Sequence, residues 1–343
     1  MGELLADHTT LRLGGPADYW LTHTDPASWP EVVQAVAGRR PFILGGGSNT
    51  LAGDGGYPRP VVRMATRGIT ARTVGDSKVE VTVHAGEPLA CTVAYAAAEG
   101  LSGIEYLGGI PGTIGAAPVQ NAGAYGQQIA DCLTSVTAWD WDRGHTVRLE
   151  ATACQFRYRS SVFRAQPSRW VILAVTLHLS RSQRAAPVTY KHLAQALDVP
   201  LGSRPPLAEA AAGVIADRQV RGLTLPDSGP DMRQAGSVFL NPPVTESQAN
   251  EVRAAGGRTY RDRDGVLRAS AGWLLEQCGY GPGRHVAPGV YCSTRRTLTV
   301  TARDGATATS FREGLRSMAR TVCEASGIEL RPEPVAPLVQ TRI

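Results

Sequence analysis

The sequence predicts an α+β protein with more than one domain. The chain has 343 residues, more than one hydrophobic core usually holds, so two or three domains are expected. Runs of alternating apolar and polar residues, typical of strands, dominate the middle of the chain. Apolar residues at helical spacing occur near both ends. Hydrophobic residues make up 43% and charged residues 19%, which indicates a globular chain rather than a disordered one.

The first part of the chain is predicted to form a strand, a helix and a second strand. Residues 17–21 form a short, mostly apolar strand. Residues 29–36 have helical spacing, with Ser28 as the expected N-cap. Residues 41–44 form a second strand, which runs directly into a glycine-rich segment. This order predicts a β-α-β unit.

The middle of the chain is mainly strand. Residues 79–84 alternate with period two, whereas residues 89–99 are rich in alanine and read as a helix. The stretch 106–125 is apolar and interrupted by glycine, with no clean period. Further strands are expected at residues 136–141, 146–149 and 170–179.

The last part mixes helices and strands after a break. Residues 203–206, Ser-Arg-Pro-Pro, are the best linker candidate. After them, Leu207, Ala211 and Ile215 share one helical face. Two later helices are expected at residues 273–278 and 311–325, and two strands at residues 238–239 and 297–300. The second of these helices carries the apolar stripe Phe311, Leu315, Met318 and Val322, and Gly327 is its expected stop.

Composition excludes several classes of function. The formal charge is +5 without a basic tract, which argues against a nucleic-acid surface, whereas scattered arginines suit an anionic small molecule. The six cysteines include no C-x-x-C pair and are expected to be free thiols. No apolar run or signal pattern is present, so a cytoplasmic protein is expected. The seven histidines are scattered, and no metal site is expected.

Two glycine-rich segments suggest a ligand site. The first, LGGGSNTL at residues 44–51, follows a strand, and its glycines let backbone N–H groups approach an anion. The second, residues 108–126, has two glycine clusters around small residues and the amide pair Gln120 and Asn121, which could bond the polar edge of a flat ring. Neither is a Rossmann G-x-G-x-x-G turn or a P-loop. An ordinary glycine-rich turn and a tightly packed structural loop are the alternatives.

Together, LGGGSNTL and YLGGIPGTIGAAPVQNAGAYGQ resemble the FAD-binding part of UDP-N-acetylenolpyruvoylglucosamine reductases. The entry HTTLRLGGPADYW, from His8, is similar to that family's N-terminal strand, and the resemblance extends to about Val335. It implies a vanillyl-alcohol-oxidase (PCMH) type FAD-binding fold in two subdomains plus a C-terminal α+β substrate-binding domain. The subdomains are expected at residues 1–66, to which the tail 327–343 returns, and 67–204, with the substrate-binding domain at 205–326.

The resemblance implies FAD as cofactor and NADPH as reductant. The residues expected to bind FAD lie in the two glycine-rich segments. They are Leu44, Gly45, Gly46, Gly47, Ser48, Asn49, Gly108, Gly109, Ile110, Pro111, Gly112, Gly115, Ala116, Gln120, Asn121, Gly123, Ala124 and Tyr125.

Three catalytic residues follow from the resemblance. Arg159, in QFRYRSSVF, matches the arginine that grips the substrate carboxylate, a geometry that suits a bidentate guanidinium. Ser237, in AGSVFLNP, matches the general acid, and Glu333, in LRPEPV, matches the active-site carboxylate. Without the resemblance, the sequence would suggest only an exposed arginine at a strand end, a serine in a turn and a solvated glutamate in a loop.

The resemblance also implies substrate-binding residues. Tyr158 would pack beside the catalytic arginine, and Tyr190, in a loop at residues 187–190, would cover the diphosphate as part of a lid. Arg218 and Arg221 lie beside a predicted helix end, and Arg221 stands roughly where relatives carry a phosphate-binding lysine. Asn241 matches a substrate contact. The chain departs from its relatives at two further positions, Leu240 in place of Lys or Thr and Arg296 in place of His or Gln, the latter an expected substrate contact.

The sequence therefore predicts an FAD-dependent enzyme that reduces UDP-N-acetylglucosamine enolpyruvate with NADPH in peptidoglycan precursor synthesis. Its partners would be small nucleotide-sugar molecules, without nucleic acid or membrane, and the chain would be a monomer. Two alternatives remain open. Leu240 and Arg296 favour a diverged paralogue that acts on another nucleotide sugar or secondary metabolite. A non-catalytic nucleotide-binding protein is the other, although the retained Arg, Ser and Glu argue against it.

Overall fold

The computed structural model describes residues 2–335 and divides the chain into two compact units. Unit 1 comprises Met1–Tyr19, Gly47–Pro58 and Leu225–Ile343, and unit 2 comprises Trp20–Gly46 and Arg59–Thr224. Each unit is built from segments that are distant in the sequence. The three-part division expected from the sequence stays a prediction, and residues 336–343 of its returning tail lie outside the described residues.

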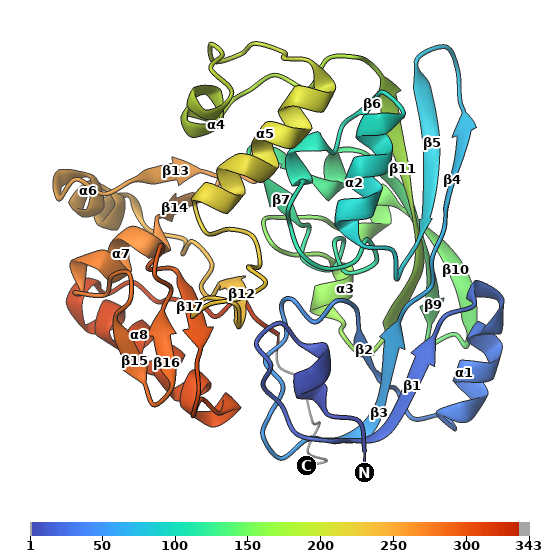
Figure 1. Ribbon diagram of the computed structural model, residues 1–343, viewed down its shortest axis with the longest axis horizontal. Helices are drawn as coiled ribbons and strands as arrows, with labels where there is room; N and C mark the ends of the chain where they lie inside the picture. Colours follow the sequence, from blue (N-terminus) through green and yellow to red (C-terminus); the bar gives the residue numbers. More distant parts are fainter. Residues whose placement is uncertain (1, 336–343) are drawn as a thin grey trace. The chain divides into compact units, whose positions relative to one another are not determined.

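Unit 2 contains a six-stranded antiparallel sheet (Figure 1). Alternate valines of one inner strand, Val79, Val81 and Val83, are at most 3% exposed, as the period-two pattern predicts. The strand order is β10 (His145–Glu150), β9 (Leu133–Asp140), β11 (Trp170–Arg181), β5 (Lys78–His84) and β4 (Ile69–Thr73), with β6 (Leu101–Ser102) paired to β11.

Helices and a small sheet complete unit 2. In Figure 1, α2 (Leu89–Ala98) and α5 (Leu207–Val220) lie side by side next to the large sheet. The small sheet has the order β1-β3-β2, and β1 and β3 run into it from unit 1. The remaining elements are β1 (Ala17–His23), η2 (Pro26–Ser28), α1 (Trp29–Ala35), β2 (Phe42–Leu44), β3 (Tyr57–Met64), η3 (Glu105–Leu107), β7 (Gly123–Ala124), β8 (Gln127–Gln128), η4 (Ile129–Asp131), η5 (Ala151–Cys154), α3 (Val162–Ala165) and α4 (Lys191–Ala196).

Unit 1 is built around a four-stranded antiparallel sheet that packs on the long helix α8 (Ala308–Ser326). The predicted stripe of α8 is fully buried, and Gly327 ends the helix in the left-handed conformation with φ +65°, as expected. The sheet order is β12 (Gln234–Ser237), β17 (Thr299–Ala302), β16 (Val290–Cys292) and β15 (His285–Ala287); η1 (Leu5–His8), α6 (Glu246–Ala254), α7 (Ala271–Gln277) and the hairpin β13 (Thr259–Arg261) and β14 (Leu267–Ala269) complete the unit.

Several local expectations were wrong. Ser28 occupies the N-cap position of α1, but its hydroxyl donates to the carbonyl of Asp25 and makes no cap bond. Ile215 is 38% exposed, because α5 buries the face that contains Val214 instead. The strand expected at residues 238–239 ends at Ser237. The linker expected at residues 203–206 lies within unit 2 and stays a prediction together with the three-part division, since the boundary between the two units comes after Thr224.

Among the described residues, no helix is both long and apolar enough to cross a lipid bilayer. In the same part of the chain, no group of three or more His, Cys, Asp or Glu side chains is placed to hold a metal ion.

Candidate functional site

The two glycine-rich segments meet in unit 2. A Cβ atom at Gly45 would lie 2.7 Å from the Thr113 hydroxyl oxygen, and one at Gly46 would lie 2.9 Å from the Cα of Gly112. Both distances are too short for a side chain, so only glycine lets the segments approach this closely. Strand β2 delivers the first segment, and its last residue, Leu44, is buried. The sequence predicted each segment separately, and the fold brings them together.

The second segment is fixed by backbone bonds to the chain that enters α2. The Gly112 carbonyl accepts from the N–H of Leu89 at 3.0 Å, and the N–H of Ile114 donates to the Glu87 carbonyl at 2.8 Å. A Cβ at Gly115 would come within 2.5 Å of the Ala85 side chain. A glycine-rich backbone fixed by these bonds suits a dinucleotide cofactor, because without side chains the cofactor can come close to the main-chain N–H groups.

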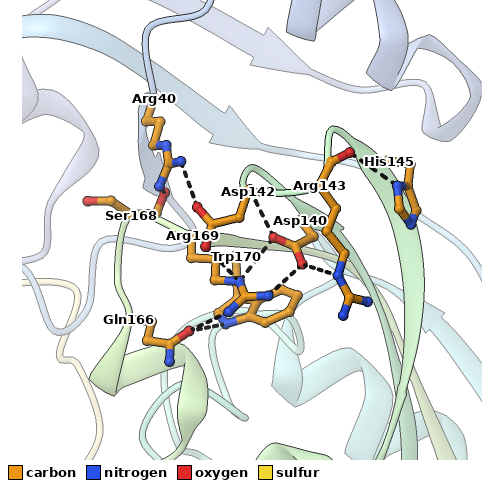
Figure 2. A network of polar contacts seen from close by, with 9 residues as sticks. All are labelled: Arg40, Asp140, Asp142, Arg143, His145, Gln166, Ser168, Arg169 and Trp170. Carbon is orange, nitrogen blue, oxygen red and sulfur yellow. Dashed lines mark hydrogen bonds and ion pairs between the residues drawn. The ribbon is translucent and has the colours of Figure 1, made fainter.

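A network of charged residues supports the start of β2 (Figure 2). The Arg40 guanidinium donates to the Asp142 carboxylate at 2.7 Å and to the Ser168 carbonyl at 3.4 Å. Asp140, which is fully buried, accepts from two nitrogens of Arg169 at 3.0 and 2.8 Å. Hydrogen bonding to Arg169 lowers the pKa of Asp140. The network therefore ties the strand that leads into the first glycine segment to the large sheet.

The first glycine segment continues into unit 1. Gly47 has φ +64°, and a Cβ there would lie 2.0 Å from the His8 carbonyl oxygen. The Asn49 carbonyl accepts from the N–H of Val335 at 2.8 Å, and the Asn49 side-chain amide donates to the Glu333 carbonyl at 3.4 Å. The end of the first glycine segment is thus bonded to the C-terminal segment.

Arg159 is anchored on the second glycine segment. One terminal nitrogen of its guanidinium donates to the Gly123 carbonyl at 2.9 Å, and the other donates to the Asn121 carbonyl at 3.2 Å. The Tyr158 ring lies 6.0 Å from the centre of the guanidinium. Arg159, predicted as catalytic, and the segment predicted to bind FAD therefore form one structure within unit 2.

Three of the predicted residues in unit 2 adopt left-handed backbone conformations that are uncommon outside glycine. The φ angles are +46° at Asn121, +49° at Tyr125 and +50° at Arg159. Strained residues of this kind occur preferentially at ligand sites, where surrounding bonds hold them in place. Of the seven non-glycine residues with positive φ in the described part of the chain, three are residues that the sequence predicts for cofactor binding or catalysis.

Asn121 has a structural role that the sequence did not reveal. Its side-chain nitrogen donates to Gln128 at 3.1 Å and to the Arg157 carbonyl at 3.2 Å, and its side-chain oxygen accepts from the N–H of Ala130. The residue is 2% exposed. These bonds hold the second glycine segment together, and contact of Asn121 with the flavin ring stays a prediction.

Tyr125 connects the second glycine segment to α5. Its hydroxyl donates to the Asp217 carboxylate at 2.6 Å, and Arg221 pairs with the same carboxylate at 3.3 Å. Burial and this hydrogen bond raise the pKa of Tyr125 to about 12, so the hydroxyl remains a donor. The Tyr190 ring meets the Tyr125 ring edge-on, with centroids 6.2 Å apart. Tyr125 thus contacts Tyr190 directly and shares the Asp217 carboxylate with Arg221. Their roles in ligand binding stay predictions.

Arg218, also on α5, is a functional candidate that the sequence placed only beside a helix end. It is 8% exposed, and burial lowers its pKa. One guanidinium nitrogen donates to the Leu223 carbonyl at 2.8 Å, whereas its Nε has no partner in the part of the chain that the structure describes. A Cβ at Gly109 would lie 3.2 Å from that Nε. The signal in the sequence was weak, since only the fold buries this arginine against the glycine segment.

Ser237 and Glu333 lie on paired segments of unit 1. The N–H of Glu333 donates to the Val238 carbonyl at 2.8 Å, and Phe239 and Pro332 form an antiparallel bridge. Among the described residues, the half-buried Ser237 hydroxyl makes no hydrogen bond. The predicted acid and the predicted carboxylate thus come from adjacent backbone positions, although they are far apart in the sequence.

The other predicted substrate residues of unit 1 are also fixed by the fold. The Asn241 side chain accepts from the N–H of Ala271, at the start of α7, at 3.0 Å and donates to the Tyr260 hydroxyl at 2.9 Å. The N–H of Arg296 donates to the Ser293 hydroxyl at 3.0 Å. The remaining cofactor candidates, Ser48, Gly108, Ile110, Pro111, Ala116, Gln120 and Ala124, lie in the two glycine-rich segments described above.

The structure therefore groups the predicted residues within each unit. Unit 2 brings together the glycine segments with Arg159, Tyr125 and their neighbours, and unit 1 brings together Ser237 and Glu333. Convergence of all three catalytic residues on one ligand stays a prediction.

Comparisons with known proteins show what the chain is similar to. Residues 24–150 match the family model of the FAD binding domain, and residues 229–336 match that of the UDP-N-acetylenolpyruvoylglucosamine reductase C-terminal domain. The chain is 40% identical to UDP-N-acetylenolpyruvoylglucosamine reductase of Salinispora arenicola over 340 residues, which cover 96% of this chain and 93% of that protein. It is 38% identical to the protein of the same name from Thermobifida fusca, with 96% of each chain covered.

The solved structure of UDP-N-acetylenolpyruvylglucosamine reductase (MurB) from Thermus caldophilus superposes with a TM-score of 0.65 and 25% identity, covering 97% of both chains. This match and the FAD-binding model confirm the expected fold class, a PCMH-type FAD-binding fold with a C-terminal α+β domain. Because a relative at 40% identity spans nearly the whole chain and both family models match, the chain belongs to the UDP-N-acetylenolpyruvoylglucosamine reductase family and is an FAD-dependent oxidoreductase.

Proposed function

We propose that the chain reduces UDP-N-acetylglucosamine enolpyruvate to UDP-N-acetylmuramate with NADPH as the reductant, a step in peptidoglycan precursor synthesis. The names of its relatives support the substrate class. The observation that carries the proposal is the attachment of Arg159 to the glycine segment of the FAD-binding domain. When bound, FAD supplies a hydride from N5 after NADPH has reduced it. The chain itself must bind the enolpyruvyl group, stabilise its charge and add a proton.

Arg159 would bind the enolpyruvyl carboxylate and stabilise the negative charge that develops beside it. The bonds to the Gly123 and Asn121 carbonyls hold the plane of the guanidinium before the ligand arrives. A cation fixed in this way needs no reorganisation during the reaction, which is the main source of electrostatic catalysis.

Ser237 would add the proton to the carbon next to the one that receives the hydride. A serine hydroxyl is a weak acid, so the transfer depends on the strong basicity of the enolate-like species and on correct placement. Pairing of the Glu333 and Val238 backbones sets the distance between the segment that carries the acid and the one that carries the carboxylate. Glu333 would orient the reacting groups or share the proton.

Arg221 and Tyr190 would bind the diphosphate of the nucleotide sugar, and Asn241 and Arg296 would bind the substrate from unit 1. Arg218 strengthens the case for an anionic ligand. Asp217 forms an ion pair with Arg221, and the Nε of Arg218 is buried without a partner among the described residues. A buried donor of this kind costs free energy unless a ligand satisfies it.

The test is a pair of half-reactions on purified protein under anaerobic conditions. The protein should be yellow, NADPH should bleach it, and the enolpyruvyl substrate should restore the colour. Ser237→Ala should keep the bleaching by NADPH and lose the recovery. Normal recovery in that variant would disprove the role of Ser237 as the acid. Recovery of the wild type with another nucleotide sugar, but not with the enolpyruvyl compound, would point to the diverged paralogue instead.

A further inference from the structure

Two consecutive buried residues, Glu105 and Tyr106, bind the backbone N–H and the backbone carbonyl of one residue, Ala186. The Glu105 carboxylate accepts from the N–H of Ala186 at 2.6 Å, and the Tyr106 hydroxyl donates to the Ala186 carbonyl at 2.5 Å. Glu105 and Tyr106 are each 1% exposed. Since Ala186 immediately precedes the lid loop at residues 187–190, this double contact fixes the point from which the lid leaves the body of unit 2.

The same two residues also fix the second glycine segment. Glu105 and Tyr106 form η3, directly before Gly108, and the N–H of Tyr106 donates to the Gln127 side chain at 2.8 Å, directly after Gly126. The Glu105 carboxylate is completed by the Ser102 hydroxyl and the N–H of Gly103, at 3.0 and 2.6 Å. Burial raises the pKa of Tyr106, so its hydroxyl stays a donor. Both ends of the FAD-binding segment therefore share their anchor with the base of the lid.

The lid itself rests on the far end of that glycine segment. Its stem is a narrow hairpin, in which the N–H of Val188 donates to the Ser203 carbonyl at 2.9 Å. A Cβ at Gly126 would come within 2.8 Å of the Thr189 hydroxyl, so the glycine is needed for the lid to approach. The Tyr190 ring packs edge-on against Tyr125 and remains 46% exposed. The lid thus has a rigid base at Ala186 and a weaker contact at its tip.

We propose that Glu105 and Tyr106 are positioning residues that couple the FAD-binding glycine segment to the nucleotide lid through Ala186. Neither residue touches the reacting atoms; each acts by setting where Tyr190 lies. The proposal rests on the proposed function, because the group that the lid covers is the diphosphate of the nucleotide sugar. Coupling of this kind is reciprocal, so an occupied FAD segment should also stabilise the lid.

Tyr106→Phe removes the hydroxyl that holds Ala186 and leaves the ring in the core. The KM for the enolpyruvyl substrate should rise at least about fivefold, the lower end of typical coupling effects, whereas the rate of flavin reduction by NADPH should stay at the wild-type value. Tyr95→Phe is the matched control, since among the described residues the Tyr95 hydroxyl makes no hydrogen bond. Trypsin cleavage after Lys191, the first residue of α4 and the residue that follows the lid, should become faster in Tyr106→Phe only.

A double-mutant cycle with Tyr190→Ala separates lid positioning from a general loss of stability. If Tyr106 acts through the lid, the two changes in KM should be strongly non-additive. Additive effects, or equal KM and cleavage rates in Tyr106→Phe and Tyr95→Phe, would refute the inference. So would a slower NADPH step with an unchanged KM. Failure of the wild type to use the enolpyruvyl substrate would instead count against the proposed function, and the cleavage assay would still test the lid.

Discussion

The backbone N–H of Glu333 donates to the carbonyl of Val238, the residue that follows the proposed acid Ser237, at 2.8 Å. Two residues further along, the N–H of Val335 donates to the Asn49 carbonyl at the end of the first glycine segment. One short C-terminal segment is therefore bonded both to the residue that follows Ser237 and to the first glycine segment. Its backbone, as well as the Glu333 side chain, should matter for function.

Val335→Pro should weaken FAD binding. The substitution removes the N–H that donates to the carbonyl of the half-buried Asn49 and also fixes φ at residue 335. An acceptor left without its donor costs about 1–3 kcal/mol. The expected result is a dissociation constant for FAD raised roughly 5- to 100-fold, measured by fluorescence titration of the apoprotein. Val335→Ala keeps the N–H and should bind FAD nearly as the wild type does. Equal affinities in the two variants would show that the backbone bond does not support the FAD segment.

Arg159→Lys should lower kcat by about a hundredfold or more, the effect typical of removing a fixed donor to a developing anion. A lysine keeps the charge but cannot donate to the Gly123 and Asn121 carbonyls and hold a carboxylate in the same plane. Steady-state kinetics measure the loss, and flavin reduction by NADPH should be unaffected. Arg157→Lys changes an exposed arginine of the same turn and should retain wild-type kcat. Similar kinetics in both variants would contradict the role of Arg159.

Arg169→Ala should destabilise unit 2 clearly more than Arg143→Ala does, because it leaves the fully buried Asp140 carboxylate without its bidentate partner. Arg143 pairs with the same carboxylate at 3.7 Å, but its side chain is 64% exposed. Arg143→Ala should therefore cost at most about 1 kcal/mol. Urea denaturation measures both changes, and comparable losses in the two variants would contradict this account of the network in Figure 2.

Asp54→Ala should lower stability by roughly 1 kcal/mol at neutral pH, as expected for the loss of a helix cap. The carboxylate accepts from the N–H groups of Ala308 and Thr309 at the start of α8, at 2.7 and 2.8 Å. Partial desolvation alone would raise the pKa of Asp54, but hydrogen bonds from Thr309 and Ala308 outweigh it and lower the pKa below 3.8.

The pH dependence of this effect follows from the sign of the shift. Because the pKa is lower in the folded state than in the unfolded state, the contribution of Asp54 is complete above the ordinary pKa and disappears as pH falls through the lowered one. The difference in melting temperature between wild type and Asp54→Ala should be constant near neutrality and shrink below about pH 4. A difference that persisted unchanged in acid would show that the carboxylate charge is not responsible.

The sequence by itself determined the features that depend on neighbouring residues. The valines of β5, the apolar stripe of α8 and the Gly327 stop follow from local periodicity and backbone freedom, and the structure confirms them. Ser28 was misjudged because its backbone, with φ −85° and ψ 12°, does not have the extended conformation of an N-cap, and Pro30 in the first turn has no N–H to donate. The motifs around Arg159, Ser237 and Glu333 indicated the family, which the relatives confirm.

Only the tertiary structure decided which distant segments meet. The approach of Gly46 to Gly112, the pairing of Glu333 with Val238 and the burial of Arg218 against Gly109 join residues far apart in the chain. The spacing of residues along the sequence cannot predict such pairs, because they form through long-range burial and backbone hydrogen bonding. For the same reason the double contact on Ala186 could not be predicted. In the sequence, Glu105 and Tyr106 carry no sign of a special role, and only the fold brings Ala186 within hydrogen-bonding distance of both side chains.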